Sequence, residues 1–388
     1  MLYNAAVSVQ NALNSVLLAM REYEQIAANF DDFVRDINAS KVPQDRQIQN
    51  IVLVIGESAQ RNFMQIYGHY LPNTPNLSAL QRQKPENLLV FSDVIASQVY
   101  TLEALSQALS FANQDELGVA WYQRLNLIDA MRLGGYKSVV ISNQEKFSVW
   151  AKATTIIFGR SDELHWTSSA RAGNVLDTMK ADGAVLGILD EVLGAKSGEQ
   201  GLFLTFHLMG SHSTYFNRYP REFERFKASD IRASRGAKFI AEYANSLLYT
   251  DFVLDEIIKR FANADSIVIY FSDHGEDVYD TGDKSSRSDA KPTRFMLEIP
   301  FLVYVSDKFI VKHPQIHARL KAATREPFMV DDLMHTLIDI AGFEVSGFEP
   351  RRSLISDDKT FLRQRARMIG KKAAINYDKE LKGQSRVE

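Results

Sequence analysis

Two patterns of apolar residues alternate along the chain. Short continuous apolar runs, rich in β-branched residues, occupy positions 51–55, 138–141, 202–206, 266–271 and 301–305. Runs of this length are typical of strands buried on both faces of a parallel sheet. Longer segments with helical character lie between or after them, at 184–193, 237–261 and 329–341. Strands that alternate with helices predict an α/β fold with a mostly parallel central sheet.

The two ends of the chain do not show this alternation of strands and helices. Residues 2–37 lack glycine and proline and favour one or two helices, followed by a polar connector at 39–49. The opening residues are too polar for a membrane span, which needs about 20 consecutive apolar residues, and lack the apolar core of a signal peptide. Residues 361–388 are rich in lysine and arginine, which predicts a fraying helix or a tail.

Polar side chains follow the predicted strands at the point where each strand ends. Asp273 and His274 come after the run at 266–271, and Glu57 comes after the run at 51–55. Ligands bind at the carboxyl ends of strands in sheets of this type, and adjacent carboxylate and imidazole groups suit a divalent metal such as zinc. The alternative is structural, with Asp273 and Glu57 capping the helices that follow.

Three further side chains occupy similar positions. His207 and His212 follow the run at 202–206, and on a loop their spacing lets both rings reach one site. Thr101 follows a strand-like segment at 89–95 and begins a helical pattern, where backbone N–H groups favour an alkoxide and an incoming phosphate. A hydrogen-bonded structural role for each histidine and a simple N-cap role for Thr101 remain open.

Composition narrows the possibilities. The 388 residues include 45% hydrophobic ones, enough for a large core, and a net charge of −3 argues against a nucleic-acid binder. Cysteine is absent, so any metal must use histidine, carboxylate or hydroxyl ligands.

Ordered motifs across about 51–355 resemble the phosphoethanolamine transferases of the bacterial envelope. This group includes the enzymes that modify lipid A and core oligosaccharide and the mobile colistin resistance enzymes, in the alkaline phosphatase and sulfatase superfamily. The motifs that carry the resemblance are Val54-Ile-Gly-Glu-Ser58, Asn73-Thr-Pro75, Ser142-Asn-Gln144, His207-Leu-Met-Gly-Ser-His212, Arg218-Tyr-Pro220, Ser272-Asp-His-Gly-Glu276 and Glu298-Ile-Pro-Phe301.

The resemblance implies a fold, a site and a reaction. It implies an α/β/α sandwich, with residues 46–388 as a periplasmic catalytic domain and 1–45 as a helical segment that links it to membrane helices. A catalytic zinc would be surrounded by Glu57, Thr101, Asp273 and His274, with Thr101 as nucleophile. The residues expected to bind the phosphoethanolamine group or assist its transfer are Asn143, Gln144, Lys146, His207 and His212.

The implied reaction moves phosphoethanolamine from phosphatidylethanolamine to lipid A, a core sugar or a glucan, through a covalent threonine intermediate. We expect a monomer at the periplasmic face of the bacterial inner membrane. The alternatives are a phosphoglycerol transferase or phosphatase of the same superfamily, and a non-catalytic binding protein of the envelope. A sulfatase needs a cysteine or serine that is converted to formylglycine, and cysteine is absent.

Two features depart from the family pattern. The family usually has another histidine after the Asp-His-Gly-Glu motif, whereas residues 281–291 contain none and offer Asp283, Arg287, Ser288 and Asp289 instead. One zinc is therefore expected and a second stays open. The absence of cysteine also sets the chain apart from the disulfide-containing lipid A enzymes, which favours a core-sugar or glucan acceptor.

Overall fold

The computed structural model describes residues 26, 28, 30, 31, 33–144, 152–167, 180–196, 201–233, 235–282, 285–372 and 374–386. Most of the helix predicted over 2–37 lies outside these residues. The described positions between 26 and 35 are helical. None of the helices in these ranges combines the length and the apolar character that a membrane span requires.

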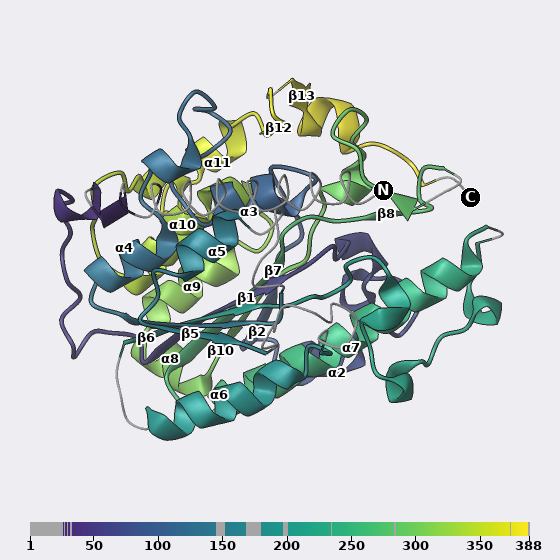
Figure 1. The fold of residues 1–388 in the computed structure, drawn as a ribbon, viewed down its shortest axis with the longest axis horizontal. Coiled ribbons are helices and arrows are strands. Elements are labelled where there is room, and N and C mark those ends of the chain that lie inside the picture. The colour runs from purple at the N-terminus through teal and green to yellow at the C-terminus, as the bar shows by residue number, and fades with distance from the viewer. Residues whose placement is uncertain are drawn as a thin grey trace, which may run out of the picture.

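A seven-stranded sheet forms the centre of the molecule, in the order β2-β10-β7-β1-β6-β4-β5 (Figure 1). All neighbouring pairs are parallel except those made by β10, which runs antiparallel to both β7 and β2. The strands are β1 (Asn50–Gly56), β2 (Leu88–Val90), β4 (Lys137–Ser142), β5 (Glu163–Trp166), β6 (Leu202–His207), β7 (Ser266–Ser272) and β10 (Phe301–Val305). This arrangement confirms the predicted mostly parallel sheet.

Helices cover both faces of this sheet, which gives three layers (Figure 1). One face carries α2 (Pro75–Gln83), α6 (Ala184–Ala195) and α7 (Ala237–Phe261). The other carries α3 (Thr101–Ala108), α4 (Leu127–Leu133), α5 (Lys152–Phe158), α9 (Pro314–Ala322) and α10 (Leu333–Ala341), with α8 (Asp307–Lys312) preceding α9.

The central strand shows why a continuous apolar run is needed. Ile51, Leu53 and Ile55 belong to the core on the α3 side of the sheet. Val52 and Val54 belong to the core on the α7 side. Successive side chains of a strand point to opposite faces, so a strand covered on both sides buries every residue.

Short strands hold the loops that surround the sheet. β3 (Val94–Ile95) pairs with β11 (Phe328–Met329), and β8 (Asp277–Val278) pairs with β9 (Ser285–Ser286). The predicted helix at 329–341 begins later than expected, because a 3-10 turn over Val330–Asp332 precedes α10.

The prediction of a fraying tail after residue 361 was wrong. The segment contains α11 (Thr360–Gln364), a hairpin of β12 (Met368–Ile369) and β13 (Ile375–Asn376), and a π-helical turn at Tyr377–Leu381. Arg367 is buried between Asp93 and Asp378. Tyr377 is buried as well, and its hydroxyl donates to Glu298 at 2.6 Å. Asp93 and Glu298 are remote in sequence from this segment. The sequence of the segment shows only its high charge, which by itself predicts exposure to solvent.

Candidate active site

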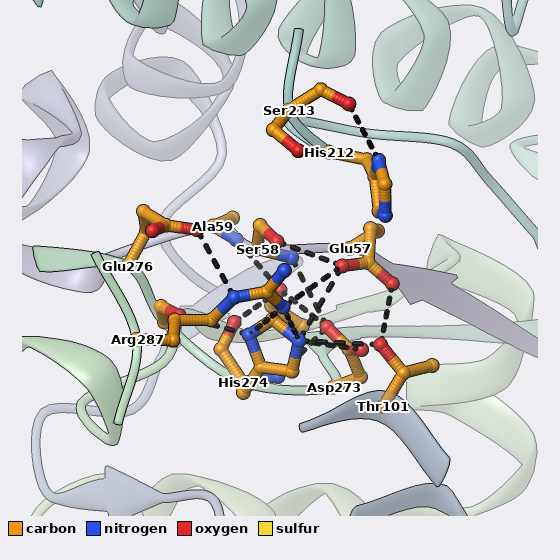
Figure 2. A network of polar contacts seen from close by, with 12 residues as sticks. Glu57, Ser58, Ala59, Thr101, His212, Ser213, Asp273, His274, Glu276 and Arg287 are labelled. Atoms are coloured by element: carbon orange, nitrogen blue, oxygen red, sulfur yellow. Dashed lines mark hydrogen bonds and ion pairs between the residues drawn. The ribbon is translucent and has the colours of Figure 1, made fainter. Parts of the chain in front are cut away.

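Three segments meet at the carboxyl ends of β1 and β7 (Figure 2). Glu57 is the first residue after β1, Asp273 and His274 follow β7, and Thr101 is the first residue of α3. The two strand ends stay in register beyond the sheet, since the Asp273 N–H donates to the Gly56 carbonyl at 3.1 Å. Glu57 and Asp273 are thereby placed side by side.

The potential ligand atoms of Glu57, Asp273 and His274 lie within 4.8 Å of one another, and all three side chains are buried. His274 Nε2 is 3.4 Å from Glu57 Oε1 and 3.2 Å from Asp273 Oδ2. The Thr101 hydroxyl donates to Glu57 Oε2 at 3.0 Å and lies 3.2 Å from His274 Nε2. The structure therefore brings together the four residues expected around the metal.

Two atoms of this cluster, His274 Nε2 and Asp273 Oδ2, can each offer an electron pair to a cation. His274 Nδ1 is 2.8 Å from the Gly275 carbonyl, which selects the tautomer with its proton on Nδ1 and a lone pair on Nε2. Asp273 Oδ1 accepts the backbone N–H groups of Ser58 and His274. Asp273 Oδ2 has no hydrogen-bond partner among the described residues. Such a donor set suits a divalent cation.

The two carboxyl groups of the cluster differ in proton affinity. Burial and the adjacent Glu57 charge raise the pKa of Asp273 well above its usual range. Burial alone would also raise the pKa of Glu57, but His274, His212 and Arg287 together hold it well below its usual range. Two carboxylates this close cannot both ionise without a compensating cation. The cluster therefore fits a bound divalent metal.

The loop after β6 fixes the backbone of Glu57. The Ser211 N–H donates to the Glu57 carbonyl at 2.9 Å. Gly210 has a positive φ of 48°, and a Cβ atom there would lie 2.7 Å from both the nitrogen and the carbonyl oxygen of Glu57. Only glycine allows this conformation and this close approach without strain.

The two predicted histidines occupy different environments. His207, the last residue of β6, is buried, its ring meets Phe158 edge-on, and its Nε2 has no partner within the described residues. Burial lowers the pKa of His207 to about 4, so it is neutral at pH 7. His212 is partly exposed, with Nδ1 2.7 Å from the Ser213 carbonyl, and Figure 2 shows its ring on the Glu57 side of the network.

Comparison with known proteins identifies the superfamily. The sequence model of the sulfatase family matches residues 49–343, most of the chain. The chain belongs to the sulfatase family.

Within this family, the chain is similar to phosphoethanolamine transferases. It is 33% identical over 343 residues to phosphoethanolamine transferase EptC of Escherichia coli K12, and 33% identical over 344 residues to phosphoethanolamine transferase CptA of Salmonella typhimurium. Each alignment covers 85% of this chain and 57% of the relative, so the chain spans little more than half the length of these relatives.

Solved structures agree with this placement. The zinc complex of the C-terminal periplasmic domain of E. coli EptC has a TM-score of 0.78 at 31% identity, covering 90% of this chain and 98% of that domain. The soluble domain of lipooligosaccharide phosphoethanolamine transferase A from Neisseria meningitidis shares the fold, with a TM-score of 0.68 at 20% identity over 83% of this chain and 96% of that one.

The sulfatase-family chain uses its predicted amide residues to support the site loops. Asn143 donates to the Lys180 carbonyl at 2.9 Å and to Asp182 Oδ1 at 2.7 Å, and accepts from Thr167. Asp182 in turn accepts the backbone N–H groups of Met209 and Gly210, both at 2.8 Å. Asn143 is thus connected through Asp182 to the loop that holds Glu57.

Gln144 and Lys146 were also predicted to bind substrate. Gln144 donates to the Leu208 carbonyl at 2.7 Å, again on the loop after β6. Lys146 lies outside the described residues.

Arg287, to which sequence reasoning assigned no role, also reaches the cluster. Its Nη1 contacts His274 Nε2 and lies 3.6 Å from Glu57 Oε1, while its Nε is 3.4 Å from Glu276 Oε2. It follows β9 directly, and the pairing of β9 with β8 brings it back over the motif after β7. The only sequence signal was its place in the segment where the family usually has a histidine.

Proposed function

We propose that this chain is the catalytic part of a zinc-dependent phosphoethanolamine transferase with Thr101 as nucleophile. The supporting observation is the position of the Thr101 hydroxyl, 3.0 Å from Glu57 Oε2 and 3.2 Å from His274 Nε2 at the edge of a cluster suited to a divalent cation. The likeness to a zinc-bound EptC domain along 98% of that domain favours the same chemistry.

In the first step, Thr101 Oγ1 attacks the phosphorus of phosphatidylethanolamine. The O–P bond to threonine forms, the O–P bond to the glycerol oxygen breaks, and diacylglycerol leaves with a proton. Glu57 Oε2 accepts the hydrogen bond of the Thr101 hydroxyl, so it orients the oxygen and is placed to receive its proton. A bound zinc ion would stabilise oxyanion charge and lower the pKa of a nearby hydroxyl.

A proton donor for the leaving oxygen is required, and the two histidines differ in suitability. His212 is partly exposed to solvent. His207 is buried and neutral at pH 7, with its pKa lowered to about 4 by burial. This contrast favours His212 for proton transfer and His207 for hydrogen bonding to the phosphoryl group. Asn143 and Gln144 would complete that binding region, with Lys146 nearby in sequence.

In the second step, a hydroxyl or phosphate oxygen of the acceptor attacks the phosphorus of the phosphoethanolamine-threonine. The new O–P bond forms as the O–P bond to Thr101 Oγ1 breaks, and Thr101 is reprotonated by the proton that Glu57 received in the first step. One relative is named as a Kdo(2)-lipid A phosphoethanolamine transferase, and its name supports an envelope acceptor here. We place the enzyme at the periplasmic face of the bacterial inner membrane, as a monomer with one zinc ion. Residues 1–45 would link the membrane to a catalytic domain spanning 46–388.

Intact mass measurement tests the proposal. The purified chain is incubated with zinc and fluorescent phosphatidylethanolamine, beside Thr101→Ala and the control Thr360→Ala, which changes the first residue of α11 instead. A phosphoethanolamine adduct on the parent and control only, with diacylglycerol released, is the expected result. Adduct on Thr101→Ala would refute the nucleophile. No adduct on any form, with zinc bound, would refute the donor or the reaction.

A further inference from the structure

Exposed aromatic side chains gather around the start of α7. Phe239, in the first turn of that helix, is 49% exposed, and its ring centre lies 6.4 Å from that of Tyr279. Tyr279 directly follows β8. Tyr70 is 38% exposed, and its hydroxyl accepts the backbone N–H of Arg232 at 3.1 Å. Arg232 lies on the segment that leads into α7, so the chain from Arg232 to Phe239 connects the two aromatic groups.

Phe216 extends this surface toward the loop after β6. It is 54% exposed and lies on the same loop as His212. The adjacent Tyr215 packs against Tyr243, with 5.0 Å between their ring centres. Tyr243 lies about one helical turn after Phe239 on α7. Phe216 is therefore held beside the first turns of α7.

The segment between Phe216 and Phe239 adds positive charge to this surface. Arg232 lies over the ring of Tyr70, 4.2 Å from its centre, so basic and aromatic side chains meet there. The exposed acidic residues of the segment are Glu222, Glu224 and Asp230. Its exposed basic residues are twice as many: Arg221, Arg225, Lys227, Arg232, Arg235 and Lys238. The chain as a whole carries a net charge of −3, so this surface is locally basic within an acidic molecule.

The surface lies at the active-site edge of the sheet. The second half of α7 packs on the sheet, whereas its first half packs against residues that follow β1 and β7, among them Phe63 and Val278. In Figure 1 the start of α7 lies at the same end of the molecule as β8. Glu57 and Asp273 also follow β1 and β7. A flat partner seated on this surface would therefore face the active site.

Exposed phenylalanines beside lysines and arginines fit the surface of a membrane that contains anionic phospholipids. Aromatic side chains favour the interface of a bilayer, where their rings leave water, and basic side chains are attracted to anionic headgroups. A soluble anionic glycan would pair with the basic residues, but it would leave Phe216 and Phe239 in water. The two phenylalanines thus favour a lipid surface over a glycan.

We propose that this surface, formed by Tyr70, Phe216, Phe239, Tyr279 and the basic segment 221–238, docks on an anionic phospholipid bilayer. The rings of Phe216 and Phe239 enter the interface, and the basic residues contact the headgroups. The docking rests on the exposed side chains alone. Its consequence, that the active site meets a phospholipid donor in the plane of the membrane, rests on the proposed function.

Flotation with vesicles of phosphatidylcholine and phosphatidylglycerol tests the apolar part of the surface. The parent chain should float with the vesicles, and a variant with Phe216→Ser and Phe239→Ser should bind at least tenfold more weakly, because two apolar rings are lost. Val311→Ser is the matched control. Val311 is 81% exposed on α8, which follows the antiparallel strand β10 and so lies at the opposite edge of the sheet. This control should bind as the parent does.

Vesicle composition tests the charge. A variant with Arg225→Gln and Lys227→Gln should bind the anionic vesicles about tenfold more weakly than the parent and should match it on pure phosphatidylcholine. Lys308→Gln, which removes an exposed charge from α8, should match the parent on both. If the phenylalanine variant is unfolded by circular dichroism, Phe239→Ser alone is used for the apolar part.

No flotation of the parent, or an equal loss in Val311→Ser, would overturn the docking. Binding of the parent to soluble dextran sulfate without binding to vesicles would replace the lipid with an anionic glycan and overturn it as well. These vesicles contain no phosphatidylethanolamine, so the result does not depend on transfer. If the parent floats but forms no adduct with phosphatidylethanolamine, the proposed function fails and the docking stands.

Discussion

Glu57 and Asp273 are two buried carboxyl groups that lie close together, an arrangement that favours the binding of a cation. Each is buried, and each is surrounded by different partners. Burial raises the pKa of both carboxyl groups, but contacts with His274, His212 and Arg287 more than offset this effect at Glu57, whereas the charge of Glu57 adds to it at Asp273. The resulting pKa difference favours one ionised and one protonated carboxyl group when no metal is bound. A divalent cation at this site would take the place of that proton.

Asp273→Asn should separate metal binding from folding. Asparagine has the shape of a protonated aspartate, and its Oδ1 can still accept from the backbone N–H groups of Ser58 and His274. We expect the zinc-free variant to melt close to the parent. Zinc at a hundred times its dissociation constant should stabilise the parent by about 2.7 kcal/mol and the variant hardly at all. Thermal melts with and without zinc check this.

Asp265→Asn is the matched control, because Asp265 is also buried and directly precedes β7 at its other end. It is ion-paired to Lys312 and His313, so its loss should lower the melting temperature and preserve the zinc response. An equal zinc response of Asp273→Asn and the parent would show that Asp273 is not a ligand.

Gly210 offers a second test, because its conformation supports Glu57. Gly210→Ala would place Cβ against the Glu57 backbone at a positive φ, which should destabilise the fold by about 1 to 3 kcal/mol and weaken zinc binding. Gly187→Ala, at an exposed position within α6 with open space around it, should instead stabilise by about 0.5 to 1 kcal/mol. Denaturant unfolding measures both, and equal changes would contradict the proposed strain.

At the scale of elements, strand ends were the most predictable part of the site. The runs at 51–55 and 266–271 correspond to β1 and β7 within two residues at each end. A strand covered by helices on both faces buries every side chain, so its whole length is apolar. The polar residues after them were therefore expected at one edge of the sheet. The family resemblance implied that Glu57 and Asp273 share one site, whereas the apolar pattern alone did not, because that pairing depends on the strand order.

α10 carries a buried histidine whose titration should affect stability. The Glu349 N–H donates to His335 Nδ1 at 3.1 Å, and burial, together with the charge of Arg352, lowers the pKa of His335 to about 3. An unfolded histidine titrates near 6.5, so the unfolded state binds more protons below that pH. The stability that His335 contributes is complete above pH 6.5 and is lost as the pH falls towards 3.

His335→Gln should reduce this acid sensitivity, since a glutamine carbonyl can accept the Glu349 N–H without titrating. Between pH 7 and pH 5 the parent should lose about 2 kcal/mol more stability than the variant, from the linkage relation. Unfolding in denaturant at both pH values, with chelator present to remove the metal contribution, measures the difference. An identical loss in both proteins would exclude His335 as the titrating group.

At the scale of the whole molecule, the segment before β1 packs against the catalytic fold. Phe30 is fully buried, and its ring centre lies 6.1 Å from that of Trp121. Val42 is also buried and donates its N–H to the Gly134 carbonyl at 3.0 Å. The boundary near residue 45 stays a prediction, and these contacts indicate that part of the preceding segment folds with the domain.

Phe30→Ala tests that contribution. Removal of a fully buried phenylalanine should cost about 3 to 5 kcal/mol of unfolding free energy, because a cavity remains. Phe33→Ala is the matched control, since Phe33 is 41% exposed and its removal should change stability by less than about 0.5 kcal/mol. Equal effects in denaturant unfolding would show that the segment does not contribute to the core.

The sequence by itself determined the local features: the buried strands, the turn from strand to polar cluster, and the adjacency of Asp273 and His274. These depend on side-chain pattern and chain connectivity alone. The tertiary structure decided which strand ends face one another, that Arg287 reaches His274, and that the charged tail buries Arg367. The physical reason is that a charged side chain is buried only where partners from distant segments compensate its desolvation, and those partners are set by the fold.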